Sequence, residues 1–236
     1  MQQHASEPCP KRVPIFHSLS ELEIQKITAV VHHKLFKKGE RIIEEGEKST
    51  SLFIIHSGKI KLSKLTVHGK EQIVHLLTVG DFFGEQNLFH ENTVMNLSGY
   101  AVEDTKICLL KKQEFDQIMA NNPDISFKFL KTITKRLAHT EDLARTLATK
   151  DPEVRIANML LEFCEIFGTE RQNAILINLP ITREEISSYV GLTRETISRK
   201  LAKFADKGIL TLIGNKQILI NDKGKLQTTG DPLLDF

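Results

Sequence analysis

The residues with the clearest chemical potential lie between Gly191 and Phe204, where apolar side chains recur with helical spacing. Ile197, Leu201 and Phe204 stand at i, i+4 and i+7, which predicts a helix with one face in the core. The opposite face carries four polar side chains in its first two turns: Arg194, Glu195, Ser198 and Arg199. An arginine can bond guanine O6 and N7, a carboxylate can accept from cytosine N4, and a serine hydroxyl can do either. This face is therefore our candidate for contacts with base edges in DNA.

Cationic and hydroxyl side chains near this face are candidates for contacts with the phosphate backbone. They are Arg183, Thr193, Lys200 and Lys203, with Lys207 as a further source of positive charge. Lysine and arginine bind phosphates whatever the base sequence. The alternative is an ordinary solvated helix face, because Glu195 and Arg199 also have the i,i+4 spacing of an ion pair. The neighbouring elements decide between these two interpretations.

The elements on both sides of this helix have the order of a winged helix–turn–helix. Thr182 and Glu185 form a capping box that opens a preceding helix. Gly191 interrupts that helix, and Thr193 caps the next one. Two short predicted strands follow, on either side of a strong hairpin signal at Gly214-Asn215. In a helix–turn–helix the N-terminal part of the second helix enters the major groove, so DNA binding is favoured over a solvated face.

A longer helix is predicted upstream, beginning after Asn122-Pro123 and ending at Asp151-Pro152. Apolar or small residues recur along it at spacings of three, four, three, four and three: Leu130, Ile133, Leu137, Thr140, Ala144 and Leu147. This heptad seam favours pairing with the same helix of a second copy, as in a homodimer. Packing of the helix on its own domain is the alternative that the pattern leaves open.

Before this helix, from about Leu35 to Leu110, the sequence has the pattern of short strands separated by turns. The stretch from Lys59 to Leu65 alternates polar and apolar residues, and a capping box at Ser20 and Glu23 predicts one short helix before the strands. Many short strands without helices between them indicate an antiparallel jelly roll, so the fold class is α+β. The predicted segments are a mobile N-terminal segment (1–15), a jelly-roll sensor (16–122), a dimerisation helix (123–150), a winged-helix domain (151–224) and a tail (225–236).

The composition narrows the function classes. The 236 residues carry a net charge of only +2, so positive charge for nucleic acid must be concentrated locally. Three cysteines indicate a reducing compartment, and neither a secretory signal nor about 18 consecutive apolar residues occur. We therefore expect a cytoplasmic protein without a membrane partner. No histidine pair with a downstream glutamate and no nucleophile–base set appears in the sequence, so we expect no enzymatic activity and no metal site.

Three segments together resemble the CRP/FNR superfamily of bacterial transcription regulators: 193–199, Gly80–Glu85 and Ser57–Ile60. The resemblance runs from about Ile15 to Asn221. It implies a jelly-roll sensor that is similar to cyclic-nucleotide-binding domains, a dimerisation helix and a winged helix, with double-stranded DNA, a second copy of the chain and RNA polymerase as partners. Glu195, Ser198 and Arg199 resemble the FNR branch, which reads TTGAT half-sites. Arg194 departs from that branch and resembles the cAMP-receptor branch, which leaves the outer bases open.

The resemblance also bears on what the sensor detects. In the cAMP branch an arginine followed by a small hydroxyl residue holds the cyclic phosphate, downstream of a glycine–glutamate pair. Gly84-Glu85 is present, but Leu97-Ser98-Gly99 stands where the arginine segment would lie, and no arginine occurs between Arg41 and Arg136. A buried phosphate without a cationic or amide partner is costly. We therefore expect no cAMP as cofactor.

The cysteines of the chain are too few for an FNR-type iron–sulfur cluster, which needs four thiolates. The chain has Cys9, Cys108 and Cys164. Resemblance to the FNR-like proteins that lack the cluster implies a disulfide switch between Cys9 and Cys108. The alternative is that Cys108 is a small buried hydrophobe and Cys9 has no role, while Cys164 is expected in the core. An unidentified small ligand in the jelly roll is the second candidate for the signal.

Overall fold

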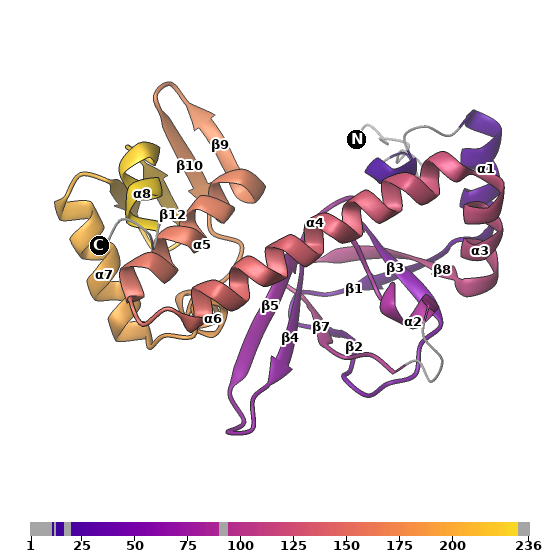
Figure 1. Cartoon of the computed structure of the whole chain (residues 1–236), viewed down its shortest axis with the longest axis horizontal. Coiled ribbons are helices and arrows are strands. Elements are labelled where there is room, and N and C mark those ends of the chain that lie inside the picture. Colours follow the sequence, from indigo (N-terminus) through magenta and orange to yellow (C-terminus); the bar gives the residue numbers. More distant parts are fainter. Residues whose placement is uncertain (1–10, 12, 17–19, 90–93, 231–236) are drawn as a thin grey trace. The chain divides into compact units, whose positions relative to one another are not determined.

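The structure is a computed structural model, shown in Figure 1, and it describes residues 11, 13–16, 20–89 and 94–230. The chain divides into two compact units, the first ending at Leu137 and the second beginning at Ala138. The division falls inside the long helix α4 (Pro123–Ala148), so each unit contains part of that helix. Among the described residues, no helix combines the length and the apolar character needed to cross a bilayer.

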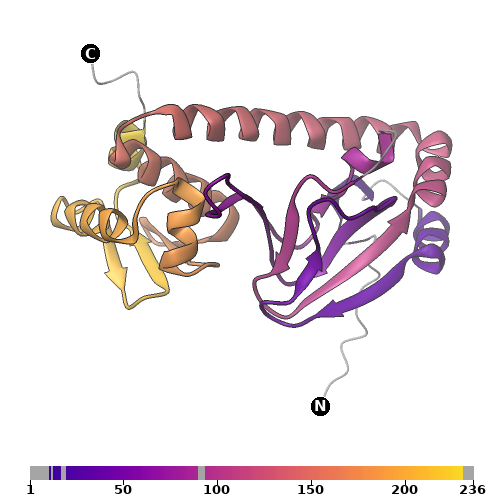
Figure 2. The same cartoon turned by 90° about the horizontal axis from the view of Figure 1, so that it is seen from below.

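The first unit is the predicted antiparallel β-sandwich. Its elements are η2 (Pro14–Phe16), α1 (Glu21–Val30), β1 (His32–Phe36), β2 (Arg41–Ile43), β3 (Ser51–Ser57), β4 (Ile60–Leu65), β5 (Glu71–Leu77), β6 (Phe82–Phe83), α2 (Gln86–Phe89), β7 (Ser98–Ala101), β8 (Thr105–Lys111), α3 (Lys112–Asn121) and the first part of α4. Two four-stranded sheets have the orders β1-β8-β3-β6 and β2-β7-β4-β5. Helices α1 and α3 lie side by side at one end of this unit in both views (Figure 1 and Figure 2). The prediction of a jelly-roll fold is confirmed.

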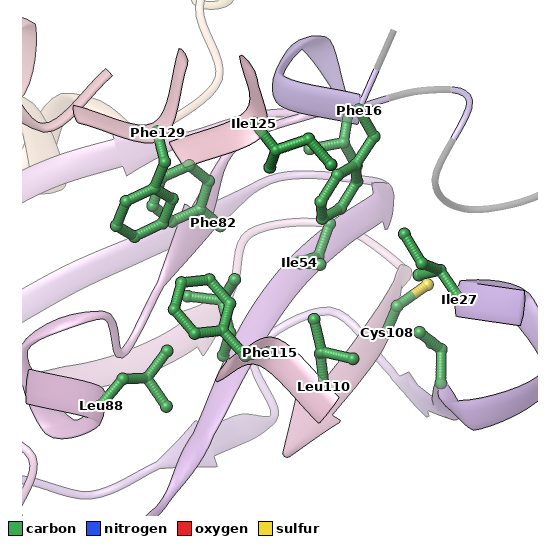
Figure 3. Packing of buried hydrophobic residues seen from close by; sticks show 13 residues of the cluster. Phe16, Ile27, Ile54, Phe82, Leu88, Cys108, Leu110, Phe115, Ile125 and Phe129 are labelled. Carbon is green, nitrogen blue, oxygen red and sulfur yellow. The ribbon is translucent and has the colours of Figure 1, made fainter. Parts of the chain in front are cut away.

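The period of two along β3 and β8 creates two separate cores. Ile54 of β3 is the cross-strand neighbour of Cys108 on β8, and both side chains belong to a cluster that also contains Ile125 and Phe129 of α4. Figure 3 shows this cluster between the sheet and the helices. The residues on the other face, among them Ile55, pack against the opposite sheet. The first cluster therefore joins the sensor strands to the start of α4.

One short helix interrupts the strands where none was predicted. Helix α2 follows Gly84, whose φ of +85° belongs to the left-handed region that glycine tolerates. A Cβ at this position would lie 2.9 Å from the backbone oxygen of Ser51, so a side chain would also clash with β3. The expectation of strands without any helix between them was wrong at this point, because a four-residue helix is too short to give a periodic signal.

The second unit is the predicted winged helix–turn–helix. After the rest of α4 it contains α5 (Pro152–Phe167), β9 (Gly168–Arg171), β10 (Ala174–Asn178), α6 (Arg183–Val190), α7 (Arg194–Asp206), β11 (Leu210–Ile213), β12 (Gln217–Ile220) and α8 (Lys223–Gly230). Its sheet has the order β11-β12-β10-β9. The buried hydroxyl of Tyr189 on α6 donates to Oε2 of Glu162 on α5 at 2.5 Å, and burial raises the pKa of this tyrosine. This bond fixes α6 on α5.

Helix α8 extends into the stretch 225–236, for which the sequence left disorder and docking as open alternatives. Leu226 is fully buried, and α8 packs against α5. The chain beyond Gly230 lies outside the described residues. A single apolar anchor such as Leu226 produces no amphipathic pattern, which is why the sequence did not indicate this helix.

Candidate nucleic-acid interface

The turn between α6 and α7 is built by the capping residues that the sequence predicted. Thr182 and Glu185 form the capping box, with the backbone N–H of Thr182 donating to Glu185 Oε2 at 2.9 Å. Gly191 ends α6 in the left-handed conformation, with φ of +67°, and its N–H donates to the carbonyl of Ser187. Thr193 then caps α7, because its hydroxyl accepts from the N–H of Thr196 at 3.3 Å. These contacts fix where α7 begins.

Helix α7 has the two faces that its sequence predicts. Ile197, Leu201 and Phe204 are buried. The candidate base-contacting side chains are all exposed: Arg194, Glu195, Ser198 and Arg199. Within the part of the chain that the structure describes, none of these four side chains makes a hydrogen bond or an ion pair. The ion pair between Glu195 and Arg199, which an ordinary solvated helix face would allow, therefore does not form. The whole polar face is available to a ligand.

Two of the candidate phosphate-binding lysines are already paired. The Nζ atoms of Lys200 and Lys203 lie 2.7 and 2.5 Å from Oε1 of Glu153, and that of Lys207 lies 3.8 Å from Oε2. Glu153 is in the first turn of α5 and its side chain is 14% exposed. Nothing local in the sequence marks this residue as a partner of the lysines, although an acidic residue in a first helical turn is typical of helix-dipole stabilisation.

The pairing keeps the carboxyl of Glu153 ionised at neutral pH. Partial burial would raise the pKa of its carboxyl, but the hydrogen bonds and charges of Lys200 and Lys203 outweigh this effect and lower the pKa from 4.5 to about 2. A carboxyl whose pKa is lower in the folded than in the unfolded protein stabilises the fold above the unfolded pKa. That stabilisation is lost as the pH falls towards the folded pKa.

We therefore expect the stability difference between the wild type and Glu153→Gln to depend on pH. The wild type should be the more stable protein at pH 7, and the difference should shrink as the pH falls below about 4.5, because protonation removes the same ion pairs. Urea unfolding of both proteins at several pH values between 7 and the acid limit of folding measures this. If the stability difference between the two proteins stayed constant as the pH falls, the lowered pKa of Glu153 would be contradicted.

The other two phosphate candidates, Arg183 and Thr193, differ in accessibility. The guanidinium of Arg183 is partly buried, and burial lowers its pKa. Its Nη1 atom is buried and finds no hydrogen-bond acceptor within the described chain. The hydroxyl of Thr193 is exposed but already serves as the cap of α7.

A second residue that the sequence analysis missed connects the end of α4 to the helix–turn–helix. The guanidinium of Arg155 on α5 donates to the carbonyls of Leu147 and Thr149 at 2.9 and 3.0 Å. It also donates to the carbonyls of Val190 and Gly191, at the end of α6, at 3.4 and 3.3 Å. One cation therefore satisfies the terminal carbonyls of two helices, which is a favourable position for positive charge.

Arg155→Ala is expected to destabilise the second unit by about 2 kcal/mol or more, since several charged hydrogen bonds to carbonyls are lost together. Arg155→Lys should retain only part of this stability, because one ammonium group cannot reach both helix ends. Urea unfolding followed by circular dichroism measures the effect, with Arg171→Ala on exposed β9 as control. Equal stability of Arg155→Ala and the control would show that these bonds contribute nothing.

The predicted dimer seam on α4 is divided between solvent and the chain's own core. Leu130 and Leu137 are each 57% exposed, and Ala144 is exposed. Thr140 and Leu147 are partly buried, while Ile133 packs against the sensor core. Part of the periodicity thus comes from packing on the first unit, and the exposed leucines leave an apolar stripe for another surface.

The sensor unit contains a polar cluster at the predicted Gly84-Glu85 turn. The guanidinium of Arg136 on α4 donates to Glu85 Oε1 at 2.8 Å and to the carbonyl of Phe82 at 2.7 Å, and it stacks on the Phe82 ring. The side chains of Arg136 and Glu85 are 17% and 14% exposed. This pair was not predicted, because its partners are 51 residues apart in the chain.

The cysteines occupy different environments. Cys108 is fully buried, and its Sγ lies 3.3 Å from Nδ1 of His33 on the neighbouring strand β1. Cys9 lies outside the described residues, so the pair of Cys9 and Cys108 stays a prediction. Cys164 is buried as expected, and burial raises its pKa to about 11, which makes it a poor nucleophile. Among the described residues no three histidine, cysteine or carboxylate side chains are grouped as metal ligands.

Two family models match the chain, one for each unit of the fold. The model of the cyclic nucleotide-binding domain matches residues 33–122, and the model of the Crp-like helix-turn-helix domain matches residues 154–229.

Relatives match this chain over most of its length. The CRP-like cAMP-activated global transcriptional regulator of Mycobacterium tuberculosis (strain ATCC 25618 / H37Rv) is 30% identical over 215 residues, which cover 91% of this chain and 95% of the relative. The fumarate and nitrate reduction regulatory protein of Yersinia pestis is 26% identical over 233 residues, covering 97% and 91%. The solved structure of FixK2 from Bradyrhizobium japonicum has a TM-score of 0.75 and 27% identity, covering 86% of this chain and 98% of that one. The first two relatives are regulators rather than enzymes, and this chain belongs to the CRP/FNR family of DNA-binding transcription regulators.

Proposed function

We propose that the chain acts as a homodimer that reads a palindrome of FNR-like TTGAT half-sites, and that the redox state of its thiols gates this binding. The observation that carries the proposal is the exposed polar face of α7, on which Arg194, Glu195, Ser198 and Arg199 make no contacts within the described chain. Two such helices in a dimer would enter successive major grooves about 34 Å apart. RNA polymerase as a further partner and a cytoplasmic location belong to the same proposal.

The dimer part of the proposal is supported by the exposed stripe on α4. Leu130 and Leu137 are large apolar residues that lie one heptad apart and are both more than half exposed. Single exposed apolar residues are common on protein surfaces, but a row at heptad spacing is typical of a helix–helix interface. A second copy of α4 would cover the row.

The position of Cys108 supports the redox part. Cys108 shares its core cluster with Ile125 and Phe129, which anchor the first turns of α4. A disulfide with Cys9 would form when a disulfide oxidant, such as oxidised glutathione, takes up two electrons and the two thiol protons and leaves as two reduced molecules. Closing that bond would change packing next to α4, and α4 is the helix that we propose pairs the two copies.

A small ligand in the jelly roll is the second candidate for the signal. The Oε2 atom of Glu85 is buried and has no hydrogen-bond partner in the described chain, although Oε1 is held by Arg136. An unsatisfied buried carboxylate oxygen is costly and is a place where a ligand donor could bind. We do not expect this ligand to be cAMP, because Leu97 packs against the core and the Ser98 hydroxyl already accepts from the backbone N–H of Glu45.

Fluorescence anisotropy of a labelled TTGAT–ATCAA duplex and a scrambled duplex tests the proposal at one fixed salt concentration. We expect the protein to bind the palindrome tightly and the scrambled duplex only weakly. The affinity for the palindrome should differ clearly between reduced protein and protein treated with oxidised glutathione. Cys9→Ser should abolish the change, and Cys164→Ser is the matched control that should retain it. Equal affinities in both states would rule out thiol gating and favour the ligand at Glu85. Equal affinities for both duplexes would overturn sequence-specific reading.

A further inference from the structure

The carboxylate of Glu153 is the centre of a charge cluster that joins α5 to α7. Three lysines approach it from one side of α7 and its C-terminal cap: Lys200, Lys203 and Lys207. The three sit at spacings of three and four, so they form one row along the helix. Lys200 is mostly buried in this contact, whereas Lys203 and Lys207 are about half exposed.

The lysines of this row have two alternative partners, the carboxylate of Glu153 and the proposed DNA phosphates. Lys200 and Lys203 are the lysines that we assign to DNA phosphates, and both donate to the same oxygen of Glu153. A lysine that moves onto a phosphate must leave the carboxylate or be shared with it, and it brings a second anion close to Glu153. The base-reading side chains are not part of the cluster, because Arg194 and Arg199 make no contact with it.

We propose that Glu153 is an intramolecular competitor for the DNA phosphates and limits the part of the affinity that does not depend on base sequence. This inference rests on the proposed DNA contacts of α7. Phosphate contacts supply essentially all of non-specific binding, whereas bidentate contacts to base edges supply discrimination. A fixed anion beside the lysines weakens the first contribution and leaves the second intact. The partial burial of the carboxylate keeps it in place and limits its screening by salt.

Glu153→Gln removes the charge and keeps the shape of the side chain. We expect this variant to bind the palindrome and the scrambled duplex more tightly by the same factor, on the order of tenfold at low salt. The plot of log affinity against log salt should become steeper, by up to about 0.9 for each half-site, because one more positive charge is free to neutralise phosphate. Glu165→Gln is the matched control: it lies three turns further along α5, is exposed and removes the same charge.

A second substitution measures the competition directly, in the wild-type and in the Glu153→Gln background. Lys203→Ala should weaken binding to both duplexes, and it should do so by a larger factor in the Glu153→Gln background, where Lys203 is no longer held by the carboxylate. Equal losses in both backgrounds would show that Glu153 does not compete for this lysine. Circular dichroism and urea unfolding of each variant identify any loss of folded protein before affinities are compared.

The outcomes separate this inference from the proposed function. Tighter binding of Glu153→Gln to both duplexes, with a steeper salt dependence than wild type and control, supports the competitor. Unchanged or weaker binding overturns it, and weaker binding would mean that Glu153 positions the lysines for phosphate. Failure of the wild-type protein to prefer the palindrome would count against the proposed half-site alone, because the gain on scrambled DNA still measures the effect of Glu153.

Discussion

Arg199→Ala is expected to lower the affinity for the TTGAT palindrome by about 1–3 kcal/mol per half-site, the discrimination that one bidentate arginine–guanine contact provides. The guanidinium is exposed and has no intramolecular partner in the described chain, so its removal should leave the fold unchanged. The loss should therefore appear in DNA binding and not in stability. At one guanine position of the half-site, the variant should also accept other bases.

Anisotropy titrations with the palindrome and with duplexes changed at single positions measure this effect. Arg171→Ala, which removes an exposed arginine from β9 in the same unit, is the matched control and should bind as the wild type does. If Arg199→Ala retained the wild-type affinity for the palindrome and the wild-type preference at every position, Arg199 would not be a base-reading residue.

The parts of the fold that the sequence predicted are those set by local chemistry. The capping boxes at Ser20 and Thr182, the left-handed Gly191 and the turn at Gly214 all lie where the pattern placed them. Each depends on contacts within a few residues of the chain, so residue type and spacing are sufficient to predict it. The buried and exposed faces of α7 follow in the same way from the helical period.

The contacts that the sequence did not predict join residues far apart in the chain. Glu153 and Lys200 are 47 residues apart, and Arg136 and Glu85 are 51 residues apart. Each of these charged residues reads in the sequence as one more solvated side chain, because nothing local marks its partner. The sequence therefore suggests candidates for contacts with DNA phosphates, but it does not show that a carboxylate already holds two of them.

The heptad pattern of α4 shows a different limit. Periodicity predicts that one stripe of a helix is apolar, but it does not say what covers the stripe. Ile133 belongs to the seam and packs on the first unit, whereas Leu130 and Leu137 stay exposed. Packing on the chain's own domain is thus confirmed for Ile133, whereas pairing with a second copy stays a prediction that the exposed leucines carry.

Leu137→Glu is therefore expected to have the largest effect on DNA binding of any substitution outside α7. A carboxylate in the apolar stripe would face its copy in a dimer, and burying two like charges is strongly unfavourable. Loss of pairing makes the two half-sites independent, so affinity for the palindrome should fall by about 10²- to 10⁴-fold. Because Leu137 is 57% exposed, the substitution should leave the fold of each copy intact.

Sedimentation velocity gives the oligomeric state, and anisotropy on the palindrome gives the affinity of the same samples. Ala138→Glu is the matched control, because it places the same charge on the next, exposed residue, outside the heptad seam. We expect the wild type and Ala138→Glu to sediment as dimers and Leu137→Glu as a monomer with weak binding to single half-sites. A monomeric wild type, or a dimeric Leu137→Glu with full affinity, would mean that the exposed leucines serve another surface. In the first case the palindrome could not be read by paired helices, whereas in the second a dimer would form through a different part of the chain.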